Sequence, residues 1–260
     1  MKKRLVSVII TASLVLCSLA NALAQQGGQT TAKPQTSATA TTTTPASGAV
    51  TITQTTSPID LARAALMAQG GEKFRNLKSV VLIGTVDLYG PNSAQSLPGK
   101  FVIVTAGDRV RVEIQSPAFN FRQIYDGQQG YSSIRGVSLP PPSRFGLNLL
   151  TKFEQPGYSV TALPDKKKQR AFRISDAEGN ATDFYVDAST GRVITYIIPY
   201  EGYTFGVEHT SLKETDGVLI PYAFSQRLEM PQGAFFAEYK VKTVKINEPL
   251  GEDVFAIPTK

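Results

Sequence analysis

The sequence predicts a mainly β protein of the α+β type, in which a strongly curved antiparallel sheet forms an incomplete β-barrel with one or two helices over its concave face. Three observations support this prediction. From residue 80 to residue 258 the chain is a nearly unbroken series of short strand-like runs separated by turn residues. Hairpin turns join successive runs, which favours antiparallel pairing. A sheet of roughly ten strands curls because of its twist, and only two apolar helical segments are available to cover it.

Residues 1–24 have the pattern of a secretory signal peptide. Residues 2–4 are basic, residues 5–20 are apolar, and the Ala-Leu-Ala of residues 22–24 fits a signal-peptidase site. We therefore expect export to the periplasm, as a mature chain without cysteine because Cys17 lies in the apolar run. Two alternatives stay open. One is lipidation at Cys17, and the other is an uncleaved signal that anchors the chain to a membrane.

Residues 25–57 are predicted to be a disordered linker. They consist mainly of Thr, Gln, Ser, Ala, Gly and Pro, with no aromatic residue and almost no charge. Such a composition cannot bury enough apolar surface to offset the entropy of ordering. The folded domain is therefore expected to span residues 58–260, which is enough for a single domain with its own core.

The first element of this domain is expected to be a short amphipathic helix. Ser57 is a suitable N-cap and Pro58 suits the first turn, while the Gly-Gly of residues 70–71 ends the pattern. Residues 72–77 could add another turn. The β-rich run at residues 80–86 then begins the sheet, and Gly84 within it indicates a bend or bulge.

Residues 100–106 and 109–115 should form a hairpin around Gly107 and Asp108. In the second arm, apolar residues alternate with charged ones, which is typical of a strand with one dry and one wet face. Further strands are expected at residues 119–125, 129–134, 158–163, 169–175, 181–187, 192–198, 203–214, 218–229 and 234–247. The intervening segments are rich in residues that tolerate turn dihedral angles.

One segment interrupts the series of strands. Three prolines at residues 140–142 precede residues 143–155, in which Phe145, Leu149 and Leu150 are spaced as in a helix or loop with one apolar side. This segment could be a lid or plug over the sheet. It could equally be a connection that covers a sheet edge.

Several segments resemble one family. The helix, Gly-Gly and first strand of residues 60–80 are similar to the opening of the periplasmic lipoprotein-sorting carriers of the LolA and LolB type. The strand, Asp-x-x-Thr-Gly turn and strand at residues 184–194 resemble another unit of the family, and residues 220–222, 239–247 and 253–258 resemble its last strands and exit. The resemblance implies an incomplete barrel whose hollow, roofed by helices, accepts the acyl chain of a lipoprotein or another lipid.

An acyl-chain carrier needs a large apolar lining. Burial stabilises a chain by roughly 0.8 kcal/mol per methylene, so a 16-carbon chain requires on the order of 10 kcal/mol. The predicted lining is Val110, Val112, Ile114, Phe172, Ile174, Phe184 and Val186 from the strands, with Leu149 and Phe153 from the interrupting segment. In the alternative interpretation the same side chains fill an ordinary core, and the protein is a structural or interaction module whose edge strand recruits a protein partner.

The expected partners follow from this lining and from the charge. They are a lipid or lipoprotein acyl chain, an envelope protein that delivers or receives it, and a membrane in transient contact. Loss of the three basic signal residues reduces the net charge from +6 to +3, with 24 basic against 21 acidic residues. The lysines at 166–168 have no interleaved aromatic residues for stacking on bases, so no nucleic-acid partner is expected.

The sequence gives no signature of an enzyme, a metal or a cofactor. His209 is the only histidine, and no G-x-S-x-G, H-E-x-x-H or phosphate-binding loop is present. Asp183 and Asp187 share one strand face, but four residues separate them by roughly 13 Å, which is too far for an acid–base pair. We therefore predict a protein that is not an enzyme, with a hydrolase that uses an unrecognised carboxylate site as the remaining alternative.

Overall fold

The computed structural model describes residues 51–118, 120–134, 140–231 and 233–258, which belong to one compact unit of the chain. The predicted signal peptide (1–24) and most of the predicted linker (25–57) lie outside the described residues. The described end of that linker precedes the first helix, and its Ile52 packs against the core. No helix in the described ranges is long and apolar enough to cross a bilayer.

Helix α1 (Pro58–Gln69) has the predicted ends. The Ser57 hydroxyl accepts a hydrogen bond from the Asp60 backbone N–H at 3.3 Å. At the other end Gly70 has a φ of 124°, a conformation that few other residues tolerate. The one-turn helix α2 (Glu72–Arg75) follows. The buried face of α1 carries mainly small and aliphatic residues, which suits close packing on a sheet.

All described strands belong to a single antiparallel sheet. They are β1 (Val80–Tyr89), β2 (Leu97–Ala106), β3 (Arg109–Gln115), β4 (Asn120–Tyr125), β5 (Gly130–Ser132), β6 (Ser159–Ala162), β7 (Gln169–Ser175), β8 (Ala181–Asp187), β9 (Val193–Tyr200), β10 (Tyr203–Thr215), β11 (Val218–Met230) and β12 (Gly233–Ile246). Their order is β5-β4-β3-β2-β1-β12-β11-β10-β9-β8-β7-β6. The first and last strands therefore meet inside the sheet, and β5 and β6 are its edges.

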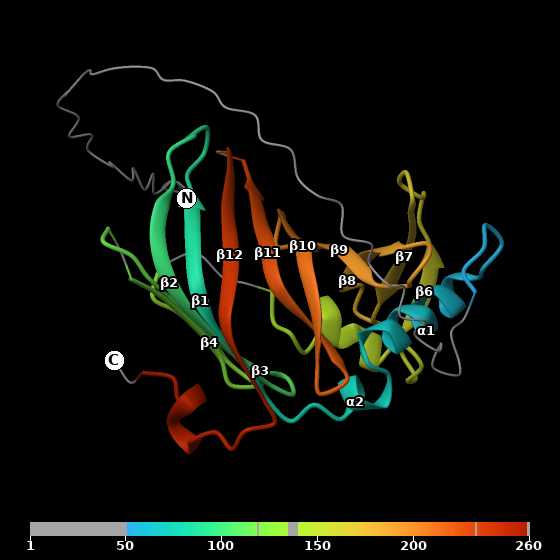
Figure 1. The fold of residues 1–260 in the computed structure, drawn as a ribbon, viewed down its shortest axis with the longest axis horizontal. Coiled ribbons are helices and arrows are strands. Elements are labelled where there is room, and N and C mark those ends of the chain that lie inside the picture. The colour runs from blue at the N-terminus through green and yellow to red at the C-terminus, as the bar shows by residue number, and fades with distance from the viewer. Residues whose placement is uncertain (1–50, 119, 135–139, 232, 259–260) are drawn as a thin grey trace, which may run out of the picture. The chain divides into compact units, whose positions relative to one another are not determined.

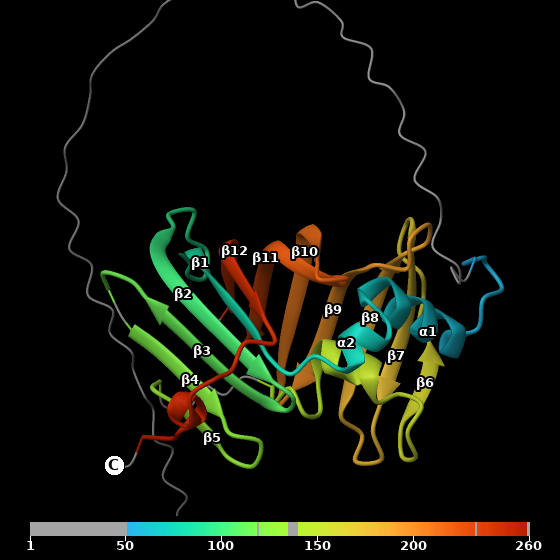
Figure 2. The same ribbon diagram turned by 60° about the horizontal axis from the view of Figure 1, so that its bottom comes forward.

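The predicted fold class is confirmed, because this sheet is strongly curved and does not close into a full barrel (Figure 1). Figure 2 shows α1 and α2 on the hollow side of the sheet. The interrupting segment forms a single 3₁₀ helix, η1 (Gly146–Thr151), which lies on the same side. The predicted bulge also occurs, since the pairing of β1 with β12 shifts register between Ile83 and Gly84.

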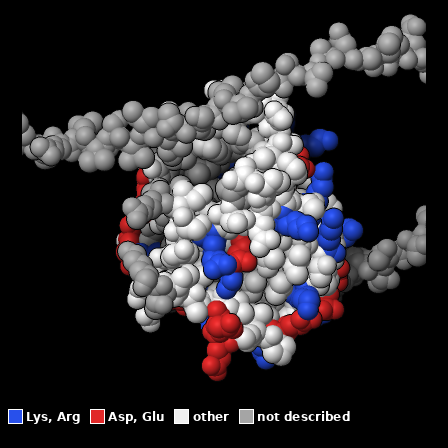
Figure 3. All heavy atoms as spheres, turned by 90° about the vertical axis from the view of Figure 1, so that its left-hand side faces the viewer, with Lys and Arg blue, Asp and Glu red and all other residues white. Residues whose placement is uncertain are grey.

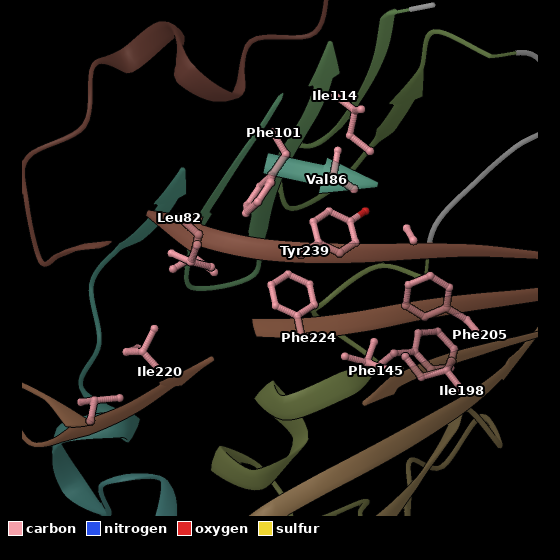
Figure 4. Packing of buried hydrophobic residues seen from close by; sticks show 14 residues of the cluster. Leu82, Val86, Phe101, Ile114, Phe145, Ile198, Phe205, Ile220, Phe224 and Tyr239 are labelled. Carbon is pink, nitrogen blue, oxygen red and sulfur yellow. The ribbon is translucent and has the colours of Figure 1, made fainter. Parts of the chain in front are cut away.

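The buried apolar residues form three clusters. One lies on the concave face around Phe101, Phe224 and Tyr239, and Figure 4 shows part of it. A second fills the space between α1, η1 and the β6–β9 end of the sheet. The third lies on the outer face of β2 and β4, where Phe255 of the 3₁₀ helix η2 (Glu252–Phe255) covers Val104 and Ile124. The C-terminal segment thus gives this end of the sheet two buried faces.

The surface carries charges of both signs. Figure 3 shows basic and acidic side chains together on the face that lies to the left in Figure 1. On the outer face of β3 and β4, Glu113 forms ion pairs with two arginines. Its Oε1 lies 2.7 Å from Arg111 Nη2 and 2.6 Å from Arg122 Nε. Acidic residues therefore neutralise part of the basic surface of the domain.

Candidate ligand-binding site

A cavity of about 460 Å³ lies on the concave side of the sheet. Its walls come from β1–β4 on one side and from β9–β11 on the other, and it is partly open to solvent. The volume is within the range of sites that bind small organic ligands. The apolar part of the sheet lining is formed by Val80, Leu82, Ile103, Val110, Val112, Ile198, Phe205, Val207, Leu219, Ile220 and Phe224.

Strand register explains why these side chains meet. On the first wall Leu82 pairs with Ile103, Ile103 pairs with Val112, and Val112 pairs with Gln123. Directly paired residues of neighbouring strands point to the same face, so the four side chains form one row across β1–β4. On the second wall a similar row runs through Tyr196, Val207 and Gln226. The curvature of the sheet turns these two rows toward a common hollow.

Two covering segments complete the lining. Phe74 and Leu77 reach it from α2 and the turn that follows, while Phe145 and Leu147 reach it from the interrupting segment of residues 143–155, called the η1 segment below. Phe145 packs edge-on against Tyr200, with ring centroids 5.3 Å apart, and Figure 4 places it beside Ile198 and Phe205. These aromatic and aliphatic contacts pack the covering segments against the sheet inside the cavity.

Polar contacts attach the η1 segment to its neighbours at the rim. Lys152 Nζ lies 2.8 Å from Asp108 Oδ1 and also donates to the Ser143 carbonyl oxygen at 2.9 Å. Asn148 Nδ2 donates to the carbonyl oxygen of Gly107 at 3.1 Å. Both contacts reach the turn between β2 and β3, so this turn and the η1 segment form one side of the rim.

Helices α1 and α2 are connected to the same segment by Glu154. Its carboxylate accepts hydrogen bonds from Arg63 Nε at 2.9 Å and from Arg75 Nη2 at 2.8 Å. These two hydrogen bonds lower the pKa of Glu154 from its ordinary value. The carboxylate therefore stays ionised at neutral pH and keeps both arginines paired.

A few polar side chains lie within the apolar wall. The His209 ring is only 6% exposed, and its Nδ1 donates to the Val193 carbonyl oxygen at 2.9 Å. Desolvation lowers the pKa of His209, and the hydrogen bond to Val193 opposes this effect. Burial likewise raises the pKa of the Tyr196 hydroxyl. Both groups are therefore uncharged at neutral pH, and this part of the wall can offer hydrogen bonds but no charge.

Comparisons with known proteins address the fold. No protein-family model matches the sequence, and no curated protein matches it. A solved LolA superfamily protein from Nitrosomonas europaea has 13% sequence identity and a TM-score of 0.51, over 78% of this chain and 98% of that chain. The chain has a LolA-like fold.

Two further solved structures are similar at a lower level. A DUF1329 family protein from Desulfovibrio piger has 10% identity and a TM-score of 0.49, over 77% of this chain and 98% of that chain. A protein domain from Vibrio parahaemolyticus, assigned to outer membrane lipoprotein sorting, has 14% identity and a TM-score of 0.46, over 75% of this chain and 97% of that chain.

The LolA-like sheet places the predicted lining residues in two different regions. Val110 and Val112 line the cavity, and the neighbouring Ile114 lies in the adjoining core cluster, paired with Phe101. The other six predicted residues do not line this cavity. They fill the cluster beneath α1, at the β6–β9 end of the sheet: Phe172, Ile174, Phe184, Val186, Leu149 and Phe153.

This division has a physical cause in the LolA-like fold. All the predicted strand residues lie on the concave face. The alternation in the sequence indicates that the residues of one strand share a face, and the curvature of the sheet decides which face is concave. However, α1 and the second half of the η1 segment occupy the concave face at β6–β9, so the side chains there contact protein atoms. The first half of the η1 segment, with Phe145, leaves the hollow next to β1–β4 unfilled.

Several lining residues were not among those predicted. Ile103 lies in the continuous apolar run of residues 101–104, so its predicted strand does not indicate which face it occupies. Phe74, Tyr196, His209 and Gln226 carry no signal either, because their position in the lining depends on how distant strands and turns meet. His209 makes a structural contact, since its ring donates a hydrogen bond to the backbone carbonyl group of Val193.

The carboxylates considered for catalysis have structural contacts in the LolA-like sheet. Asp183 pairs with Arg173, with Oδ2 accepting from Nη2 at 2.9 Å. Asp187 accepts hydrogen bonds from the backbone N–H groups of Ser189 at 3.0 Å and Thr190 at 2.9 Å, which stabilise the turn after β8. In the described part of the chain, no group of three or more His, Cys, Asp and Glu residues is arranged to hold a metal ion.

Proposed function

We propose that this protein is a non-enzymatic carrier of the periplasm that holds the acyl chain of a lipid or lipoprotein in the concave cavity. The observation that carries the proposal is the hollow of about 460 Å³ between β1–β4, β9–β11 and the two covering segments. Its lining is mostly aliphatic and aromatic. Such a lining provides the non-directional burial that a hydrocarbon chain needs to leave a membrane.

The distribution of charge supports an amphiphilic ligand. Among the described lining residues, the charged ones are Arg75, Lys78, Asp108 and Lys152. All four belong to α2 and the turn after it, the β2–β3 turn, or the η1 segment, and none belongs to the wall of β9–β11. An acyl chain could therefore lie along the apolar walls while a polar headgroup remains near the rim and solvent.

The LolA-like fold is the second support for this proposal. In the proposed function, an envelope protein delivers or receives the ligand, and the carrier contacts membranes transiently. Export rests on the predicted signal peptide of residues 1–24, with an uncleaved signal anchor as the alternative for its attachment. The proposal that the protein is not an enzyme rests on the contacts of Asp183 and Asp187 and on the structural role of His209.

A protein-interaction module is the competing function. The β6–β9 end of the concave face favours it, because protein side chains fill that region completely, with Phe172, Ile174 and Phe184 having no exposed surface. The unfilled hollow beside β1–β4 favours the carrier, since a module has no use for an empty apolar site of this size.

Two measurements test the carrier. Protein purified from native membranes and periplasm is extracted with organic solvent, and mass spectrometry of the extract is expected to reveal a stoichiometric lipid. The delipidated protein is then expected to bind a fluorescent fatty-acid probe that an unlabelled lipid displaces. If the extract contains no lipid and the probe does not bind, the carrier function is wrong and the interaction module is favoured.

A further inference from the structure

The wall formed by β9–β11 contains a cluster of three polar side chains, Tyr196, His209 and Gln226. Tyr196 and Gln226 are the two register neighbours of Val207, one on each side. His209 follows Val207 by two residues in β10, and all four residues line the cavity. The cluster therefore surrounds one valine on the concave face, and His209 pairs with Phe224, which Figure 4 labels.

The hydrogen bond of His209 fixes which of its nitrogens carries the proton. A carbonyl oxygen only accepts hydrogen bonds, so Nδ1 must donate to Val193 and must carry the proton. In the neutral ring, Nε2 is then an acceptor without a proton. Nε2 has no hydrogen-bond partner in the part of the chain that the structure describes, and the residue, which is only 6% exposed, lines the cavity.

The bond to Val193 also shows why the ring cannot turn away from the cavity. Strands β9 and β10 pair up to Glu208 and Thr195, and the register of β10 shifts just beyond His209. The carbonyl group of Val193 therefore lies beyond the last paired residues of β9 and β10. There it accepts a hydrogen bond from the His209 imidazole and not from a backbone N–H group of β10. Releasing this bond would leave a buried carbonyl group without a partner, which is costly.

The other two members add uncharged hydrogen-bonding groups. The Tyr196 ring contacts the His209 ring edge-on, with centroids 5.9 Å apart, which holds the two polar groups on one part of the wall. Gln226 supplies both an amide donor and an amide acceptor. The charged lining residues among those described lie on the covering segments and the β2–β3 turn, so an ionised ligand group would find no counter-ion at this cluster.

We propose that the cavity selects an amphiphile whose uncharged hydroxyl or amide group donates a hydrogen bond to His209 Nε2, with Tyr196 and Gln226 as its further partners. The inference rests on the proposed carrier function and deepens it. The ligand is bound both by its hydrocarbon chain and by a neutral polar group buried against β9–β11. A hydrocarbon chain alone would leave the Nε2 lone pair desolvated and without a partner.

Two probes with the same chain isolate the hydrogen-bond donor. Monopalmitoylglycerol and methyl palmitate share a palmitoyl ester, and only the first has hydroxyl groups. Their dissociation constants are measured by displacement of a fluorescent fatty acid, and the ratio of the two constants is compared between wild-type and variant protein. Comparing ratios removes the difference in the solubility of the probes.

The decisive variant is H209N. The asparagine amide N–H can take over the bond to the Val193 carbonyl oxygen, but the acceptor at the position of Nε2 is removed. We expect H209N to lose roughly two- to tenfold of the wild-type preference for monopalmitoylglycerol, the amount typical of one net hydrogen bond. Y196F, which keeps the aromatic ring, should reduce the preference in the same direction, and it serves as the test if H209N does not fold.

Three results would overturn the inference. A ratio that is unchanged in both folded variants would mean that ordered water, and no ligand group, satisfies the cluster. The wild-type protein could bind methyl palmitate more tightly than monopalmitoylglycerol, with the same ratio in the variants. That result would mean that the β9–β11 wall contacts ligands only as an apolar surface. If neither probe binds the wild-type protein, the proposed carrier function itself is wrong, and the inference fails with it.

Discussion

Gly84 of β1 lies so close to the carbonyl oxygen of Lys240 in β12 that a Cβ atom at residue 84 would collide with it. The same Cβ would also come within 2.9 Å of the Phe101 ring. The contact occurs where the β1–β12 register shifts, so the missing side chain permits the bulge between the first and last strands.

We therefore predict that Gly84→Ala destabilises the domain by more than about 2 kcal/mol, because the backbone of two central strands must separate. Urea unfolding followed by circular dichroism measures the loss. Gly90→Ala is the matched control, since no atom lies within 4 Å of its added Cβ. Equal stability of the two variants would show that the bulge tolerates a side chain.

Filling the cavity should weaken ligand binding while the fold remains intact. Val112 lines the hollow from β3, so Val112→Trp is expected to weaken binding of a fluorescent fatty acid by at least about tenfold, because the indole takes the space of the chain. Ile83→Trp places the same side chain on the outer face of β1, at a residue that is 36% exposed, and should bind as the wild type does. Equal binding by both variants would place the ligand elsewhere.

The predicted lining residues beneath α1 should affect stability more than binding. Phe172 has no exposed surface and stacks on Phe184, with ring centroids 5.2 Å apart. Phe172→Ala is expected to cost about 3–5 kcal/mol in the free energy of unfolding, with unchanged affinity in the protein that remains folded. Ile103→Ala, at a half-buried residue of the cavity, should cost less than Phe172→Ala and should weaken binding. Loss of affinity in the folded Phe172 variant would instead extend the site to β7.

His209 predicts how stability depends on pH. Desolvation lowers its pKa in the folded state below the unfolded value of 6.5, so the unfolded chain binds the proton more readily. Neutral His209 therefore contributes its full share of the free energy of unfolding above pH 6.5. This contribution is lost as the pH falls from 6.5 toward the folded-state pKa. The wild-type protein should lose up to about 1.4 kcal/mol per pH unit in this range.

The H209N variant isolates this effect, because His209 is the only histidine. Its stability should be nearly constant between pH 7 and about pH 5.5, above the range in which carboxylates titrate. Urea titrations at a series of pH values provide the comparison. Parallel pH profiles for wild type and variant would contradict the assigned burial of the imidazole.

The local features of this fold could be predicted from the sequence. Alternation in residues 109–115 placed Val110 and Val112 together on the dry face of one strand, and the Gly-Asp turn before them forms the expected hairpin. The bulge at Gly84 and the cap at Ser57 were likewise visible, because each depends on a few neighbouring residues. These features together determine a curved antiparallel sheet.

The position of the cavity could not be predicted in the same way. Val112 and Phe184 have the same pattern and both lie on the concave face, yet one lines a hollow and the other is enclosed by protein. The difference arises from where α1 and the η1 segment pack, and that depends on contacts such as the pairing of Glu154 with Arg63 and Arg75. Contacts between residues so far apart leave no periodic signal in the sequence.

The pairing of Val80 with Ile246 joins the two ends of the domain at the centre of its sheet. Closing the loop between β1 and β12 is slow, because most of the domain lies within it. Until β12 has been synthesised, β1 and β11 each lack one of their two neighbouring strands. The central pairing of the sheet therefore forms only after the last strand of the domain has been synthesised. A chain that ends before β12 would therefore leave the β5–β1 and β11–β6 parts of the sheet without the strand that joins them.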